Sequence, residues 1–429
     1  MSQGKRGTPL SFLLLAALSS AHPHAAPWDA VTALLQQAIT NRTFPGCVAL
    51  VLDPTGALIF SAALGFQTYG QPALSGGNPA LTFSGTLWDM ASLTKIMGAN
   101  TVAAYLYQRG ALDPSWPVAS PRLLGARFSA KGKGGVTVRQ LLLHSAGFPA
   151  DPSPGFMDPA FGCPSPLRLS FSCTEAVFSA VLAQPLAAPP GAIFLYSDLS
   201  FITLMYALGA LIEREGWAPD ATRLPQCAGA GEGLRLACAF EAFWRTTVAP
   251  LAGPLPSTGF LPAPAAWQRC APTWNETLGP RGVQLQGQVC DENSWASGGV
   301  QGHAGIFSAG PDVAAFLRAW QGRGGAALNA STIRYWTAVD NAAFSSRALG
   351  WDTMAASDGY RGCGARFSAA TFYHTGYTGT QLCVDPASGV ATALLASRTY
   401  PNKTAHFAEM QDIRQRFNDA VAAALAASQ

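Results

Sequence analysis

The most informative segment of the chain reads DMASLTK and spans residues 89–95. From Ser92 onward, the apolar spacing predicts a helix that continues to Gln108 and stops at Gly110. Residues three apart share one face of a helix, so the amine of Lys95 can reach the hydroxyl of Ser92. Because a serine needs a base to become a nucleophile, and a lysine kept neutral by its surroundings can be that base, the spacing indicates a catalytic pair. The alternative is an N-cap serine followed by a surface lysine.

Two further short motifs follow downstream. Tyr196-Ser197-Asp198 comes after a turn-forming Pro-Pro-Gly, and a phenol held near a cation can act as a general base or relay a proton. The alternative is a buried tyrosine with a satisfied hydroxyl. His374-Thr375-Gly376 precedes an expected strand at Gln381. An edge strand there can offer a backbone N–H to an oxyanion, while the two side chains donate to a substrate carbonyl or carboxylate.

The order and spacing of these motifs resemble those of the penicillin-recognising serine hydrolases, which carry Ser-x-x-Lys, Tyr-x-Asn/Asp and Lys/His-Thr-Gly in this order. Longer segments are similar to class C β-lactamase-related proteins, and the nearest branch is that of the D,D-carboxypeptidase and esterase-like members. The resemblance covers nearly all of the mature chain. Its segments are residues 89–95 (DMASLTK), 137–147 (TVRQLLLHSAG), 196–199 (YSDL), 298–308 (GGVQGHAGIFS) and 374–380 (HTGYTGT).

The resemblance implies a role for each motif residue. Ser92 is acylated, Lys95 and Tyr196 share the acid/base work, and the backbone amides of Ser92 and Tyr377 form the oxyanion hole. The other motif residues are expected to contact the substrate, and they are Asp198, His374, Thr375 and Gly376. Neither a cofactor nor a metal ion is expected, and the chain has no Cys-x-x-Cys or His-x-x-x-His spacing.

The chain departs from the pattern at three positions. His374 stands where true β-lactamases have lysine, which argues against antibiotic hydrolysis. Asp198 stands where many relatives have asparagine. An ionised aspartate near Lys95 would raise the pKa of the lysine and shift the burden of the base to Tyr196. Cys290 stands where relatives often have histidine, which is easiest to understand if Cys290 is in a disulfide.

Histidine is scarce, with six in the chain. His144 and His303 attract interest for this reason, because histidine is the side chain that titrates near neutral pH. Both lie in glycine-flanked segments that are typical of turn and packing positions. We therefore expect both to be structural.

The pattern of elements predicts an α/β (α+β) fold of the β-lactamase/transpeptidase type, with an antiparallel sheet flanked by helices and a mainly helical lobe. Expected helices are residues 29–40 and 405–427, and expected strands are 47–52, 57–64, 381–384 and 390–397. Strands near both ends imply that the termini meet in one α/β lobe. We assign residues 27–90 and 299–429 to this lobe and residues 91–298 to the helical lobe, with a surface insertion at about 216–240.

The N-terminus and the cysteines indicate secretion. Residues 1–21 have a basic start, an apolar centre and small residues before Ala21, as in a secretory signal peptide; a mitochondrial presequence is the alternative. Eight of the nine cysteines fall into four neighbouring couples, which predict the disulfides Cys163–Cys173, Cys227–Cys238, Cys270–Cys290 and Cys363–Cys383, with Cys47 left as a buried thiol. Sequons at Asn41, Asn275, Asn329 and Asn402 predict glycosylation in the secretory lumen.

Composition limits the functional classes. With 49% apolar and 12% charged residues the chain is globular, and a scattered net charge of +3 gives no reason to expect a nucleic acid partner. Apart from the leader, no segment reaches the ~18 apolar residues of a membrane span. We expect a peptide or small-molecule substrate, and acyl transfer to water from a D-amino-acid peptide or a small carboxylic ester. The alternatives are a transacylase and a catalytically silent scaffold or binding protein, although intact Ser92, Lys95 and Tyr196 argue against silence.

Overall fold

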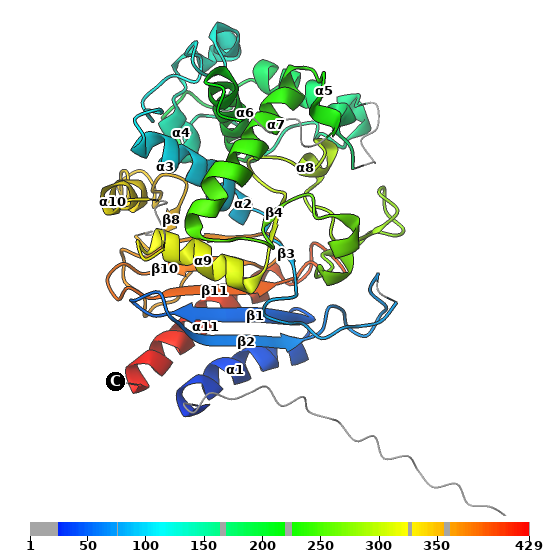
Figure 1. Ribbon diagram of the computed structural model, residues 1–429, viewed down its shortest axis with the longest axis vertical. Coiled ribbons are helices and arrows are strands. Elements are labelled where there is room, and N and C mark those ends of the chain that lie inside the picture. The colour runs from blue at the N-terminus through cyan, green and yellow to red at the C-terminus, as the bar shows by residue number, and fades with distance from the viewer. Residues whose placement is uncertain are drawn as a thin grey trace, which may run out of the picture.

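The computed structural model describes residues 25–74, 76–163, 169–218, 225–324, 328–355 and 361–428. The predicted signal peptide at residues 1–21 lies outside these residues. The fold is a mixed α/β structure with an antiparallel sheet and many helices, as the sequence predicts (Figure 1).

A six-stranded antiparallel sheet joins the two ends of the chain. Its order is β2-β1-β11-β10-β9-β8. The strands are β1 (Gly46–Leu52), β2 (Leu58–Gly65), β8 (Asp352–Thr353), β9 (Phe372–Thr375), β10 (Gln381–Val384) and β11 (Ala391–Ala396). The hairpin of β1 and β2 turns through Asp53, which accepts a hydrogen bond from the Thr55 N–H at 2.8 Å. The first hairpin thus pairs directly with the last strand, which confirms that the termini meet in one sheet.

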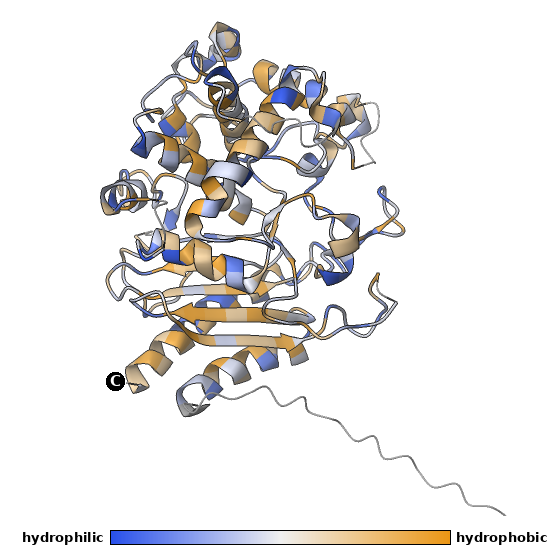
Figure 2. Cartoon of the chain, in the orientation of Figure 1, coloured by the Kyte–Doolittle hydropathy of each residue, from blue (hydrophilic) through white to orange (hydrophobic). Residues whose placement is uncertain are grey.

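Both faces of the central strands are buried. Every residue of β1 is buried, and the strands at the centre of the sheet are hydrophobic over most of their length (Figure 2). Because side chains alternate along a strand, Cys47 and Val51 enter one apolar core while Val48 and Leu52 enter the other. The sheet is therefore the middle layer of the molecule.

Helices cover the two faces of the sheet. The first and last helices, α1 (Ala25–Thr40) and α11 (Phe407–Ala427), pack together against one face (Figure 1). Helix α9 (Gly310–Trp320) packs against β1 and β11 on the opposite face. The predicted terminal helices are thus confirmed, with small differences at their ends.

A mainly helical layer lies beyond α9. Its helices are α2 (Leu93–Lys95), α3 (Thr101–Gln108), α4 (Val138–Leu142), α5 (Thr174–Ala183), α6 (Asp198–Arg214), α7 (Glu232–Phe243), α8 (Glu292–Ala296) and α10 (Ala330–Thr337). The predicted helix from Ser92 to Gln108 is present as α2 and α3, which a π-helical turn at Ile96–Asn100 joins. Two small sheets are also present, one of β3 (Trp88–Asp89), β7 (Ile306–Ser308) and β4 (Gly259–Phe260), the other of β5 (Trp274–Asn275) and β6 (Gln284–Leu285).

The expected surface insertion at about 216–240 needs correction at its end. Residues 234–240 belong to α7, which packs against α6, and all of them except Arg235 are buried. This part of the predicted insertion is therefore not on the surface. No helix within the described ranges is long and apolar enough to span a membrane.

Three of the four predicted disulfides are present: Cys163–Cys173, Cys227–Cys238 and Cys363–Cys383. Cys47 is a buried thiol, as predicted. The fourth pairing is wrong, because Cys270 and Cys290 are both free and buried. The reason is that each packs into a different apolar cluster, Cys270 with Leu87 and Phe307, and Cys290 with Val289 and Trp295. Three disulfides are compatible with a secreted protein.

Candidate active site

Ser92 lies at the point where strand β3 turns into helix α2. The preceding residue, Ala91, has a left-handed backbone (φ 47°), a conformation that costs a non-glycine residue free energy and recurs at functional sites. Asp89 holds this turn, because one carboxylate oxygen accepts the Ala91 N–H at 2.9 Å and the other accepts the Cys290 N–H at 2.7 Å. Burial raises the pKa of Asp89 to about 6, against the lowering effect of these two hydrogen bonds. The turn leaves Ser92 partly exposed.

Lys95 lies behind Ser92. Its Nζ donates to Ser92 Oγ at 3.1 Å and forms an ion pair with Asp198 Oδ1 at 2.6 Å, while the lysine side chain is fully buried. Asp198 is thus close enough to Lys95 for the effect on the lysine pKa that the sequence analysis made conditional on this proximity. Burial by itself lowers the pKa of Lys95, but the charges and hydrogen bonds of Asp198 and Tyr196 outweigh it and hold the pKa above its ordinary value. The carboxylate of Asp198 at 2.6 Å thus favours the ammonium form of Lys95.

Tyr196 and Asp198 come from the start of α6. Ser197 caps this helix, because its hydroxyl accepts the Ser200 N–H at 3.2 Å. The Tyr196 ring centroid is 4.8 Å from Lys95 Nζ. Asp198 is the first residue of the helix, where the helix dipole favours a negative charge. The cap thus orients both side chains toward Lys95.

His144 supports Tyr196 from behind. Its Nδ1 accepts the Ser197 N–H at 3.0 Å, and its ring lies 4.4 Å from the Tyr196 ring. Burial, together with the nearby cations Arg347 and Lys95, holds the pKa of His144 well below its usual range. A neutral imidazole that packs on Tyr196 agrees with the structural role expected for His144.

The His-Thr-Gly segment is tied to the turn that carries Ser92. The hydroxyl of Thr378 donates to the Asp89 carbonyl at 2.8 Å, and that of Thr380 donates to the Met90 carbonyl at 3.1 Å. A side chain at Gly376 would collide with both neighbours, because its Cβ would lie 2.7 Å from the Met90 carbonyl oxygen and 2.0 Å from Thr380 Oγ1. Arg414 of α11 donates to the carbonyls of Gly376 and Thr380. This turn is therefore held at a fixed distance from Ser92.

A cavity of about 390 Å³ opens in front of Ser92. Tyr196, His374, Thr375, Gly376 and Tyr377 line it as well, so most of the predicted site residues meet at one cavity. Lys95 and Asp198 lie behind Ser92. Among the described residues, no hydrogen bond uses the backbone N–H of Ser92 or Tyr377. Both groups are thus available to a ligand.

Arg347 is a cavity residue that the sequence analysis missed. One of its nitrogens, Nη2, pairs with Asp352 at 3.1 Å, whereas Nε and Nη1 are buried and have no partner among the described residues. His374 has a second unpaired atom here, since its Nδ1 donates to the Thr375 carbonyl at 2.9 Å and its Nε2 has no described partner. Burial, with Arg347 and Lys95 adding to it, lowers the pKa of His374 well below its usual range. Arg347 therefore adds a cation to the wall of the cavity, where its guanidinium carbon lies 5.3 Å from the centroid of the Tyr196 ring.

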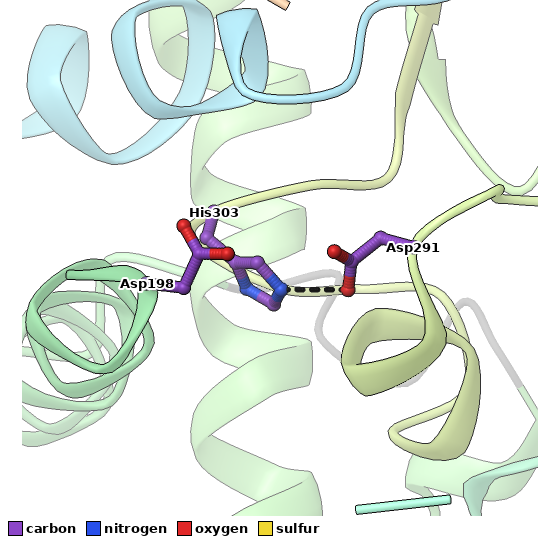
Figure 3. Close-up of side chains that lie close together, drawn as sticks. All are labelled: Asp198, Asp291 and His303. Atoms are coloured by element: carbon purple, nitrogen blue, oxygen red, sulfur yellow. Dashed lines mark hydrogen bonds and ion pairs between the residues drawn. The ribbon is translucent and has the colours of Figure 1, made fainter. Parts of the chain in front are cut away.

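A second group that sequence reasoning missed lies beside Asp198. His303 and Asp291 form an ion pair, with Nε2 at 2.8 Å from Oδ1, and ligand-type atoms of both residues and of Asp198 lie within 4.8 Å of one another (Figure 3). Such side chains can bind a divalent cation. The Lys95 ammonium already lies 2.6 Å from the Asp198 carboxylate, however, so a second cation would be repelled. We expected only a structural role for His303, and that expectation did not include its ion pair with Asp291.

Comparison with known proteins defines the class. The beta-lactamase family model matches residues 31–223 and 229–416, so the chain belongs to the beta-lactamase family. A provisionally named D-alanyl-D-alanine carboxypeptidase of Escherichia coli (strain K12) is 27% identical over 367 residues, which are 82% of this chain and 78% of the relative.

Solved structures share the fold. EstCE1, a hydrolase with promiscuous acyltransferase activity, is similar with a TM-score of 0.64 and 21% identity over 92% of this chain and 98% of its own. Simvastatin synthase (LovD) from Aspergillus terreus has a TM-score of 0.63 and 19% identity over 93% of this chain and 98% of its own. Class C beta-lactamase and penicillin-binding protein homologues are also among the similar structures. The fold predicted from the motifs is thus confirmed, and the family relationship supports a hydrolase.

Proposed function

We propose that the chain is a serine acyl hydrolase that works through an ester on Ser92. The observation that carries the proposal is the contact of Ser92 Oγ with Lys95 Nζ at 3.1 Å and of Lys95 Nζ with Asp198 at 2.6 Å, next to the open cavity. A silent scaffold would have no need for a buried ammonium ion that contacts a partly exposed hydroxyl. Burial of such an ion costs free energy unless it is paired.

The raised pKa of Lys95 decides how the acid/base work is divided. An ammonium ion cannot accept a proton, so Tyr196 in its phenolate form takes the proton of Ser92 Oγ as that oxygen bonds to the substrate carbonyl carbon. Lys95 stabilises the phenolate, and Asp198 holds Lys95 in place. The N–H groups of Ser92 and Tyr377 stabilise the oxyanion. Tyr196 then gives the proton to the leaving group, and water hydrolyses the ester.

The substrate class follows from the cation in the cavity. Arg347 lines the same cavity as Ser92, and a carboxylate is the substrate group that pairs best with a guanidinium. A peptide cleaved by a carboxypeptidase carries its free carboxylate close to the scissile bond. This favours the D,D-carboxypeptidase function that the name of the Escherichia coli relative carries.

A second function, acyl transfer on or from small esters, rests on a different observation. Tyr377 and Phe407 at the cavity are 43% and 50% exposed, and such aromatic surface fits an apolar acyl group. The names of the two similar structures, an acyltransferase-active hydrolase and a synthase, support this alternative.

We further propose secretion into an oxidising compartment, with a cleaved leader and glycans on the exposed Asn41, Asn275, Asn329 and Asn402.

One experiment separates the two functions. Wild type and Arg347→Gln are compared on an N-acyl-D-Ala-D-Ala dipeptide and on its uncharged ester counterparts. In Arg347→Gln, loss of a charged hydrogen bond should lower kcat/KM for the dipeptide by about 10–100-fold. The value of kcat/KM for the esters should change by no more than about twofold. Equal losses on both substrates, or turnover of the esters alone, would exclude the carboxypeptidase proposal. Ser92→Ala should abolish all turnover in either case.

A further inference from the structure

Two segments of the sequence that the proposed mechanism does not use meet behind Lys95. Asp291 ends the loop before α8 and caps that helix, since its Oδ1 accepts the Ser294 N–H at 2.7 Å. His303 lies in the glycine-rich loop before β7. The caps and packing of these segments place one carboxylate and one imidazole next to Asp198 (Figure 3).

The loop that carries His303 is held rigidly. Gly302 packs so closely that a Cβ there would lie 2.1 Å from the Phe201 carbonyl oxygen of α6. The Ile306 N–H donates to Thr94 Oγ1 of α2 at 3.1 Å, and the Ser294 hydroxyl donates to the Ala304 carbonyl at 3.0 Å. His303 is therefore fixed between the helices that carry Lys95, Asp198 and Asp291.

The charges of this group form a chain. Lys95 pairs with Asp198 at 2.6 Å, His303 pairs with Asp291 at 2.8 Å, and the two pairs adjoin through Asp198 and His303. His303 is 1% exposed, and its Nδ1 has no partner among the described residues. The charged groups that face it are Asp291, Asp198 and Lys95, with the exposed Asp151 farther out. With His303 protonated, the two pairs sum to zero; with His303 neutral, they sum to one negative charge.

We propose that His303 and Asp291 are positioning residues that tune the Lys95–Asp198 pair, so that protonated His303 supports acylation of Ser92 and neutral His303 weakens it. The inference rests on the proposed function of Ser92. When His303 loses its proton, the uncompensated negative charge binds Lys95 more tightly to Asp198 and opposes the Tyr196 phenolate. Acylation should therefore fall with rising pH as His303 deprotonates.

The neighbours of His303 place its pKa within the pH range that a rate profile can cover. Burial lowers its pKa, but the charges of Asp291 and Asp198 outweigh burial and raise the pKa above the ordinary 6.5. The Asp198 carboxylate connects the two cations, because it lies 2.6 Å from Lys95 Nζ and within 4.8 Å of the His303 imidazole. At an effective dielectric constant of about 20, one unit charge at about 7 Å changes a pKa by about one to two units. The effect is large enough to dominate the alkaline limb of the profile.

The test is the pH dependence of Ser92 labelling by a fluorophosphonate, measured between about pH 5 and 10. Fluoride needs no proton to leave, so the rate reports activation of Ser92 alone. Wild type should show a decline on the alkaline side. Asp291→Asn keeps the helix cap but removes the charge, and it should move this decline to lower pH by about one to two units. His303→Gln should remove the decline and keep the slow alkaline rate throughout.

Three further measurements keep the inference separable from the proposed function. Glu292→Gln, next to Asp291 but paired with Lys403, is the matched control and should leave the decline in place. NMR titration of the His303 imidazole should give a pKa above 6.5 in wild type and a lower one in Asp291→Asn, whether or not Ser92 reacts. The decline should persist with EDTA. A decline at the same pH in Asp291→Asn and His303→Gln, or one that EDTA removes, would overturn the inference; an unlabelled wild type would instead refute the function of Ser92.

Discussion

Asp198→Asn tests how Lys95 is held in the site. The carboxylate lies 2.6 Å from Nζ of a lysine with a side-chain exposure of 0%, so the variant leaves a buried ammonium ion without its anion. Removing one partner of a buried ion pair costs about 3–5 kcal/mol of stability. Burial lowers the pKa of Lys95, and in the variant the Asp198 charge no longer counters this effect. The pKa of Lys95 should therefore fall below the ordinary 10.5 by about 1–3 units.

The sign of the pH dependence follows from these shifts. In wild type the pKa of Lys95 is raised by folding, so its stabilising effect is complete below pH 10.5 and is lost only as the pH rises through the higher folded pKa. In Asp198→Asn the pKa of Lys95 in the folded protein lies below its pKa in the unfolded chain. The loss of unfolding free energy caused by the substitution is therefore largest at low pH. The difference in unfolding free energy between the two proteins should narrow by about 1.4 kcal/mol per pH unit from the lowered pKa up to 10.5.

The assay combines urea unfolding at pH 6 to 10 with the rate of Ser92 labelling. Neutral Lys95 in Asp198→Asn becomes the base itself, so labelling should persist and gain an acid limb at the lowered pKa of the lysine. Asp412→Asn is the matched control: its pair with Arg416 is exposed, and its loss should cost at most about 1 kcal/mol. A stability difference that does not change with pH, together with an unaltered labelling profile, would refute the assignment of Lys95 as an ammonium ion held by Asp198.

Three other predictions concern the base, the turn and the cysteines. Tyr196→Phe should lower kcat by about 10²–10⁴-fold with little change in melting temperature, and a smaller loss would return the role of base to Lys95. Gly376→Ala should lower kcat/KM by at least about tenfold, because the new Cβ displaces the turn that carries the Tyr377 N–H, whereas Gly135→Ala, with no atom near its Cβ, should have no effect on kcat/KM. The unfolded, unreduced protein should bind three equivalents of a thiol reagent, at Cys47, Cys270 and Cys290. One equivalent would instead indicate a Cys270–Cys290 disulfide.

The local sequence patterns predicted the central sheet of the molecule well. The hairpin at β1 and β2 and the strands β10 and β11 were readable because their apolar residues continue over most of each strand. The same patterns predicted that the two ends share a sheet. They did not separate surface from core at residues 234–240, because small apolar residues occur in both.

The parts of the site carried by short motifs were predictable, and those carried by tertiary contacts were not. Ser92 and Lys95 are one helical turn apart, so spacing alone relates them. Arg347 reaches the cavity through the pairing of β8 with β9, and no local pattern records that pairing. Asp291 and His303 were visible as residues, but only the fold brings them to Asp198. The pairing of Cys270 with Cys290 failed for the same reason, since nearness in sequence does not put two thiols in one cluster.

The central claim is that Ser92 is the nucleophile. Wild type is treated with a fluorophosphonate, the adduct is detected by intact mass, and the modified residue is located by peptide mapping, with folded Ser92→Ala as the reference. The account predicts one adduct per chain, located on Ser92, and none on the variant. An adduct on another residue, or a folded wild type that takes up no label, would contradict it.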